Sequence, residues 1–100
     1  MAVEFVVTVQ AATLDGQDAD TVKLDAVGGR LATHEVAMRV DGPRVWVTVT
    51  VQDQGPVAAL GQANAIVLAA CDAVGEPVEW RAATVYNGDE YARQMMAHEI

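Results

Sequence analysis

Few side chains in this sequence have the type and spacing that catalysis or metal binding requires. His34 and His98 are each followed by a glutamate, and a His-Glu pair can bind a metal ion or transfer a proton. Both histidines fall where solvated histidines are common, His34 at a strand end and His98 in a terminal turn. No third ligand stands at a metal-binding spacing, and no nucleophile lies beside a base. We therefore expect no metal site and no cofactor, and the sequence favours a non-catalytic protein while leaving enzymatic activity open.

Cys71 and Asn64 both fall in Pro56–Gly75, a stretch that predicts a long helix with proline in its first turn and glycine at its end. The apolar residues at helical spacing form its predicted core-facing stripe: Val57, Leu60, Val67, Cys71 and Val74. Cys71 is therefore interpreted as a small core residue. Asn64 lies within the same stripe. Its amide either bonds to nearby backbone groups or contacts a ligand held between helix and sheet.

The opposite side of this predicted helix lacks the charges that a solvent-exposed helix normally carries. It holds Ala58, Gln62, Ala65, Ile66, Ala69 and Ala73. Asp72 is the only charged residue between Pro56 and Gly75. A helix that is apolar nearly all round is usually covered on two sides. We therefore expect a neighbouring element or a partner to cover it, which makes Ala58, Ala65, Ile66 and Ala69 interface candidates.

Alternating apolar and polar residues predict four strands, at 3–10, 34–40, 44–52 and 77–86. Asp41-Gly42-Pro43 is a turn signal that joins the second and third strands into a hairpin. Residues 18–28 predict a shorter helix, capped by Asp18 or Asp20 and stopped by Gly28-Gly29. Residues 89–100 predict a short C-terminal helix. In the last strand we expect one face to hold Val78, Trp80, Ala82, Thr84 and Tyr86.

The two halves of the chain, about 3–42 and 45–88, resemble each other. Val7-Thr8-Val9-Gln10 recurs as Val49-Thr50-Val51-Gln52, and Asp25-Ala26-Val27-Gly28 recurs as Asp72-Ala73-Val74-Gly75. Two strand–helix–strand units with right-handed crossovers interleave into one antiparallel sheet with both helices on one face. The arrangement resembles the ferredoxin-like fold. The resemblance implies an α+β, βαββαβ two-layer sandwich, and we expect residues 1–100 to form a single domain.

The charged residues limit the classes of partner. Six basic residues stand against fourteen acidic ones, a net charge of −8, which argues against nucleic acid and anionic membranes. An acylphosphatase-like phosphate loop would need an arginine after the first strand, where this chain has Ala11–Gly16 and the carboxylate of Asp15. Cross-strand ion pairs are expected among Arg39, Arg44 and Arg81 and Glu4, Glu35 and Glu79.

The N-terminus lacks the features of a signal peptide, and no stretch of transmembrane length is free of polar residues. A single cysteine cannot form an internal disulfide bond and fits a reducing compartment. We therefore expect a cytoplasmic protein.

Three functional hypotheses follow. The first is a non-catalytic module that self-associates, as a homodimer or larger homo-oligomer, or binds another protein. Besides the alanine side of the long helix, its interface candidates are Trp46, on the outward face of its strand, and Met95 and Met96 in the predicted C-terminal helix. The second is a small-molecule site, enzymatic or regulatory, as in dimeric ferredoxin-like barrels. Its ligand candidates are Asn64, His34, Trp80 and Tyr86. The third is a component of a larger particle, such as a viral one.

Overall fold

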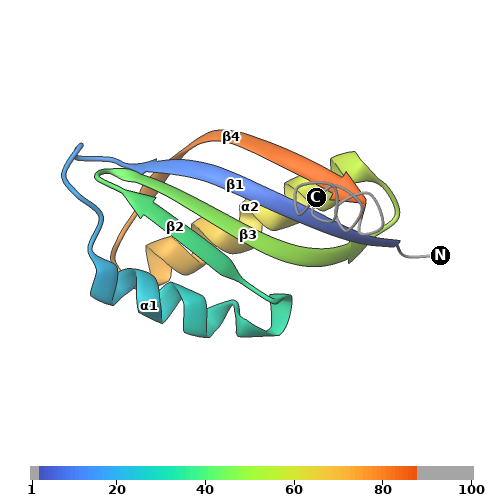
Figure 1. Cartoon of the computed structure of the whole chain (residues 1–100), viewed down its shortest axis with the longest axis horizontal. Coiled ribbons are helices and arrows are strands. Elements are labelled where there is room, and N and C mark those ends of the chain that lie inside the picture. Colours follow the sequence, from blue (N-terminus) through green and yellow to red (C-terminus); the bar gives the residue numbers. More distant parts are fainter. Residues whose placement is uncertain (1–2, 88–100) are drawn as a thin grey trace, which may run out of the picture.

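The computed structural model (Figure 1) describes residues 3–87. The elements are β1 (Val3–Thr13), α1 (Thr21–Arg30), β2 (Ala37–Asp41), β3 (Arg44–Asp53), α2 (Pro56–Ala73) and β4 (Val78–Asn87), with a 3-10 turn, η1 (Ala32–His34), after α1. The predicted C-terminal helix at 89–100, with Met95, Met96 and His98, lies outside the described residues.

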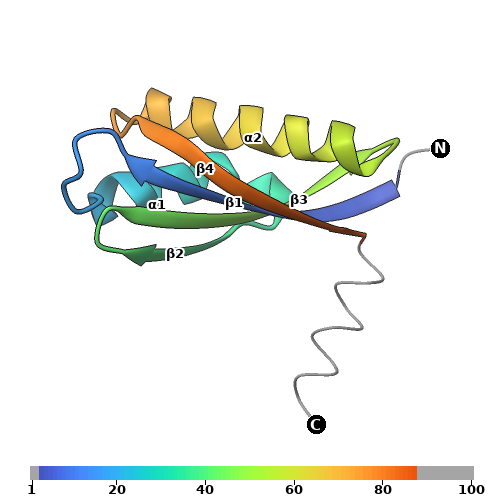
Figure 2. The same ribbon diagram turned by 90° about the horizontal axis from the view of Figure 1, so that it is seen from above.

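The four strands form one antiparallel sheet in the order β2-β3-β1-β4. The first strands of the two halves, β1 and β3, are adjacent in the centre, and β2 and β4 lie at the edges, so the two βαβ units interleave. Both helices pack on the same side of the sheet and contribute to one core (Figure 2). The predicted α+β architecture with a four-stranded antiparallel sheet and two helices is confirmed, and it is compatible with a ferredoxin-like sandwich.

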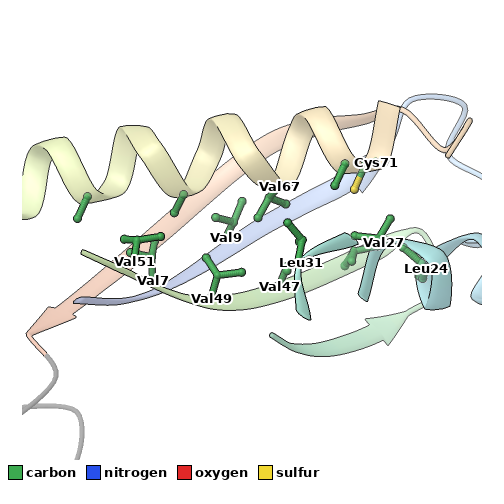
Figure 3. Packing of buried hydrophobic residues seen from close by; sticks show 14 of the residues in the cluster. Val7, Val9, Leu24, Val27, Leu31, Val47, Val49, Val51, Val67 and Cys71 are labelled. Atoms are coloured by element: carbon green, nitrogen blue, oxygen red, sulfur yellow. The ribbon is translucent and has the colours of Figure 1, made fainter. Parts of the chain in front are cut away.

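The core lies between the helices and one face of the sheet, and it is built mainly from valine and alanine (Figure 3). The central strands supply Phe5, Val7, Val9, Val45, Val47, Val49 and Val51. The helices supply Leu24 and Val27 from α1, and Ala59, Ala63, Val67, Ala70 and Cys71 from α2. Each fully buried valine contributes on the order of 1.5 kcal/mol or more of transfer free energy. The alternation of valine in the two central strands therefore fixes which sheet face the helices cover.

The start of α2 at Pro56 is confirmed, and Gly75 follows its end with a φ of +79°. The predicted core-facing stripe is partly wrong, because Val57 is 85% exposed. The residues closest to the sheet include three alanines, whose short side chains let the helix axis lie near the strands. The prediction gave weight to the larger apolar residues and so rotated the expected inner face.

Asp20 is the N-cap of α1, with Oδ1 accepting from the backbone N–H of Val22 at 2.9 Å and of Lys23 at 3.3 Å. The predicted stop at Gly28-Gly29 is wrong, because the helix runs on to Arg30. A glycine inside a helix costs about 1 kcal/mol but keeps its backbone hydrogen bonds, so burial of the helix can outweigh it. At Gly28 a Cβ would lie 3.7 Å from Met38 Sδ, which shows how closely α1 approaches β2.

Two strand predictions also need correction. A register shift between Gln10 and Ala11 in the pairing of β1 with β4 marks a β-bulge, and Arg81 is the residue of β4 without a partner there. One extra residue moves the side chains beyond it to the other face. Ala82, Thr84 and Tyr86 consequently lie on the face opposite to Val78 and Trp80. In addition, β2 begins at Ala37, and His34 lies in η1 instead of the strand.

Candidate functional site

The most unusual surface of the molecule is the outward side of α2. We define the α2 outer face as its exposed residues after Pro56: Val57, Ala58, Gly61, Ala65, Ala69, Asp72 and Ala73. Of the 18 residues of α2, five are buried. The interface candidates Ala58, Ala65 and Ala69 lie on this face, whereas Ile66 is partly buried and packs against the core. No part of the chain between residues 3 and 87 covers the α2 outer face.

Length and composition alone would let α2 cross a membrane, and among residues 3–87 it is the one helix for which this holds. In the fold, however, α2 packs on β1, β3 and β4. Its inner residues Ala63, Val67 and Cys71 are nearly inaccessible to solvent. The core therefore accounts for the apolar inner side of α2 but not for its apolar outer face.

The two ends of α2 differ in charge. Gly55 is the N-cap and, having no side chain, leaves the first-turn N–H groups without a side-chain acceptor. Near the other end, Asp72 is exposed. An uncapped N-terminus carries partial positive charge, so the α2 outer face presents one positive end and one carboxylate.

A groove continues the α2 outer face toward the start of β4. It is a cavity of about 450 Å³ lined by Leu14, Leu68, Ala69, Asp72, Pro77 and Val78. The Leu14 side chain at its border is 65% exposed. Trp80, on the helix side of edge strand β4, is 45% exposed. Large apolar side chains are thus exposed near the α2 outer face, whose single charged residue is Asp72.

The other interface candidate, Trp46, lies on the sheet face that α1 and α2 leave open. The guanidinium carbon of Arg39 stands 4.0 Å from the centroid of the Trp46 ring, and the two residues face each other across β2 and β3. Next to this pair, the hydroxyl groups of Thr8 and Thr48 form a hydrogen bond, with 2.8 Å between the two oxygens. A cation–π contact at an exposed site is worth about 0.5–1 kcal/mol. Trp46 therefore has a stabilising neighbour within its own chain.

The four ligand candidates do not meet. Asn64 is on α2, with its Oδ1 buried and without a hydrogen-bond partner in the described part of the chain. His34 Nδ1 lies 3.3 Å from the carbonyl oxygen of Thr50, near the far end of β3. Trp80 is on the helix side of β4, and Tyr86 is on the opposite face of the same strand. Residues 3–87 also contain no cluster of three potential metal ligands. The geometry forms no shared ligand or metal site from these residues.

Cys71 is buried in the core, where it is 1% exposed. Burial and, as a smaller cause, the nearby carboxylate of Glu76 together raise its pKa from 9.0 to about 11. The thiol is therefore protonated at neutral pH and inaccessible, which matches its interpretation as a core residue rather than a nucleophile.

One cluster was not found by sequence reasoning. We define the arginine pocket as the cavity of about 390 Å³ lined by Gln10, Ala12, Thr13, Gly16, Pro43, Arg44 and Arg81. Its two arginines come from β3 and β4, on either side of β1. Among the described residues the ion pair that forms is Arg81–Glu79, within one strand, at 3.2 Å. Only the strand register brings the two arginines together, so no local motif could have revealed them.

No protein-family model, curated protein or solved structure matches this chain.

Proposed function

We propose that this protein is a non-catalytic assembly module with a ferredoxin-like fold, and that it forms a homodimer through the α2 outer face. The observation that carries the proposal is an 18-residue helix on the surface with Asp72 as its only charged residue. The strand order β2-β3-β1-β4, with both helices on one side, supports the ferredoxin-like assignment.

The size of the interface decides which residues must belong to it. A helix of this length is roughly 27 Å long and about 10 Å wide, so its exposed strip is well below the roughly 800 Å² per partner of a standard interface. The interface therefore includes the groove beside α2, with Leu14, Leu68 and Pro77. Leu14, which lines the groove, and Trp80, two residues beyond Val78 on the same face of β4, supply the large apolar side chains that α2 lacks.

A second copy fits this face better than an unrelated partner does, because the charges are self-complementary. In a two-fold dimer each surface meets itself. When two α2 helices pair antiparallel and cross at Ala65, the small residues Gly61 and Ala69 allow close approach. Residue 72 then faces the partner's Ala58, in the first turn. Each Asp72 lies beside an uncapped helix N-terminus, a contact typically worth 0.3–1 kcal/mol.

The oligomeric state tests the proposal. We expect sedimentation of the wild-type chain at high micromolar concentration to show a dimer, and the variant Ala65→Glu to show a monomer, because the new carboxylates face each other at the crossing point. Ala26→Glu is the matched control, since Ala26 is exposed on α1. It should leave the dimer intact. A wild-type monomer at this concentration, or equal behaviour of the two variants, would exclude the α2 dimer.

The other hypotheses have less support. A small-molecule function based on Asn64, His34 and Tyr86 lacks a shared pocket in the described residues, because they lie on different parts of the fold. A net charge of −8 supports a protein partner over nucleic acid or an anionic membrane surface. The protonated, buried Cys71 is compatible with the cytoplasmic location that we propose.

A further inference from the structure

We propose a second, independent site: the arginine pocket binds a compact oxyanion, such as the carboxylate or phosphate group of a small metabolite. The pocket holds two of the six basic residues of a chain whose net charge is −8. None of its lining residues is acidic. Arginine is the side chain best suited to paired hydrogen bonds with carboxylate and phosphate oxygens.

The sheet places the two arginines at a spacing that suits one such group. Ala12 on β1 pairs with Arg44 on β3 on one side and with Glu79 on β4 on the other. Neighbouring strands lie about 4.8 Å apart, so β3 and β4 are separated by roughly 10 Å across β1. Arg81, the unpaired bulge residue of β4, stands two residues beyond Glu79 and pairs with its carboxylate at 3.2 Å. The methyl group of Ala12 leaves space between Arg44 and this pair. The two guanidinium groups can therefore approach one small anion from opposite sides.

Hydrogen bonds fix the walls of the pocket before any ligand arrives. The backbone N–H of Thr13 donates to the carbonyl of Pro43 at 2.9 Å, and that of Ala19 donates to Gly42 at 2.9 Å. These bonds tie the loop after β1 to the turn between β2 and β3. The Thr13 hydroxyl also donates to the Gln17 carbonyl at 2.6 Å. A site that is already formed loses less conformational entropy on binding.

Charges around the pocket favour an anion despite the acidic chain. Arg44 has no carboxylate within ion-pair distance among the described residues, and Glu79 balances only Arg81. The lining residues and Glu79 together carry one net positive charge, and Asp41, which pairs with Arg44 in the strand register, does not line the pocket. The sequence has the carboxylate of Asp15 where an acylphosphatase-like loop would bind phosphate. In the structure Asp15 Oδ1 accepts from the backbone N–H of Gln17 at 3.0 Å, and Asp15 lines a different cavity, beside Lys23 and Gly75.

The test is an NMR titration of the ¹⁵N-labelled full chain with inorganic phosphate and, separately, with acetate, at constant ionic strength maintained with chloride. We expect saturable shifts of the Ala12, Gly16 and Arg44 amides, with a dissociation constant on the order of millimolar, as befits a small exposed site. Saturation by phosphate alone would identify a phosphate group as the ligand. Saturation by acetate alone, or by both anions, would identify a carboxylate or a general oxyanion site.

Variants separate a built site from general charge effects. Arg44→Gln and Arg81→Gln should each weaken binding at least about fivefold, because each removes a charged donor. Ala12→Leu should weaken it comparably by filling the space between the arginines without changing charge. Arg30→Gln, at the exposed end of α1, is the control and should bind like the wild type. Shifts that do not saturate with either anion, an equal loss in Arg30→Gln, or full binding by Ala12→Leu would overturn the proposal. None of these results depends on dimer formation through α2.

Discussion

The two helices lie in the same layer, but only α1 has the outer surface of a solvated helix. Asp20 caps α1, Asp25 is exposed along it, and Arg30 stands in its last turn, where a cation is favoured. The N-cap of α2 is Gly55, without a side chain, and its one charged residue is Asp72. Toward the sheet the helices behave alike, since both bury small and medium apolar side chains in one core.

The difference shows that the fold does not require an apolar outer face on its helices. In this architecture α1 serves as an internal reference: it packs on the same core while exposing Asp25 and Arg30 to solvent. The alanine-rich outside of α2 therefore needs a cause outside the described fold. Packing against a second copy is the cause that we propose, because it would cover the apolar face and place Asp72 next to an uncapped helix end.

The largest effect on stability is expected for substitutions on the sheet-facing side of the helices, where α1 and α2 both bury apolar side chains. Val67→Asp on α2 and Val27→Asp on α1 each place a carboxylate where the valine is fully buried. An unpaired buried charge costs several kcal/mol, about as much as the whole stability of a domain this small. We expect both variants to lose the cooperative thermal transition seen by circular dichroism. Val57→Asp, at a position that is 85% exposed, is the control and should stay folded. If Val67→Asp folds normally, α2 does not form a layer of the core.

Much of this inner side was predictable from the sequence, because alternation is a strong signal in a chain rich in valine. The strand predicted at residues 44–52 is found as Arg44–Asp53, and Pro56 marks the start of α2. Both depend on local chemistry: every second residue of β3 is valine, and proline suits a first helical turn.

The features that the sequence could not predict depend on single residues or on contacts between residues far apart in the chain. The bulge at Arg81 is one extra residue, which moves Tyr86 to the opposite face without any glycine or proline to signal it. The inner face of α2 was predicted in a rotated position because Val57 was counted as more suited to the core than alanine. In the structure the smaller side chain of alanine lies against the sheet. The arginine pocket required the register between three strands, which no local pattern contains.

A second difference between the inner faces is chemical, because α2 buries the thiol of Cys71 whereas the buried side chains of α1 are Leu24 and Val27, neither titratable. The pKa of Cys71 is raised to about 11 in the folded chain. Well below pH 9 the thiol is protonated in both the folded and the unfolded chain, so it does not change the free energy of unfolding with pH. Between pH 9 and 11 it ionises only in the unfolded chain, so the free energy of unfolding falls by up to about 3 kcal/mol.

Urea denaturation at a series of pH values from 8 to about 11 measures this decline. Cys71→Ala should lose the part of the decline that the thiol causes, while any decline due to other groups remains. An identical pH dependence in the two proteins would mean that Cys71 ionises equally easily in the folded state, in contradiction to its burial.

The smallest expected effect concerns the N-cap of α2. Variants at this position distinguish effects on the stability of the monomer from effects on dimerisation. Gly55 has extended backbone angles typical of an N-cap, and a Cβ there would have no atom within 4 Å. Gly55→Ser should therefore stabilise the monomer by a few tenths of a kcal/mol, measured by denaturation at low concentration. Gly55→Asp should stabilise the monomer at least as much, because its charge also suits the helix dipole.

In the dimer the two variants should diverge. The proposed pairing brings the partner's Asp72 to the first turn of α2, so Gly55→Asp sets two carboxylates side by side and should weaken dimerisation several-fold by sedimentation. Gly55→Ser should not, and Asp72→Asn should restore much of the affinity of Gly55→Asp by removing the repulsion. If Gly55→Asp dimerises as tightly as the wild type, Asp72 does not lie at the partner's helix end. The antiparallel pairing of α2 helices that cross at Ala65 would then be excluded.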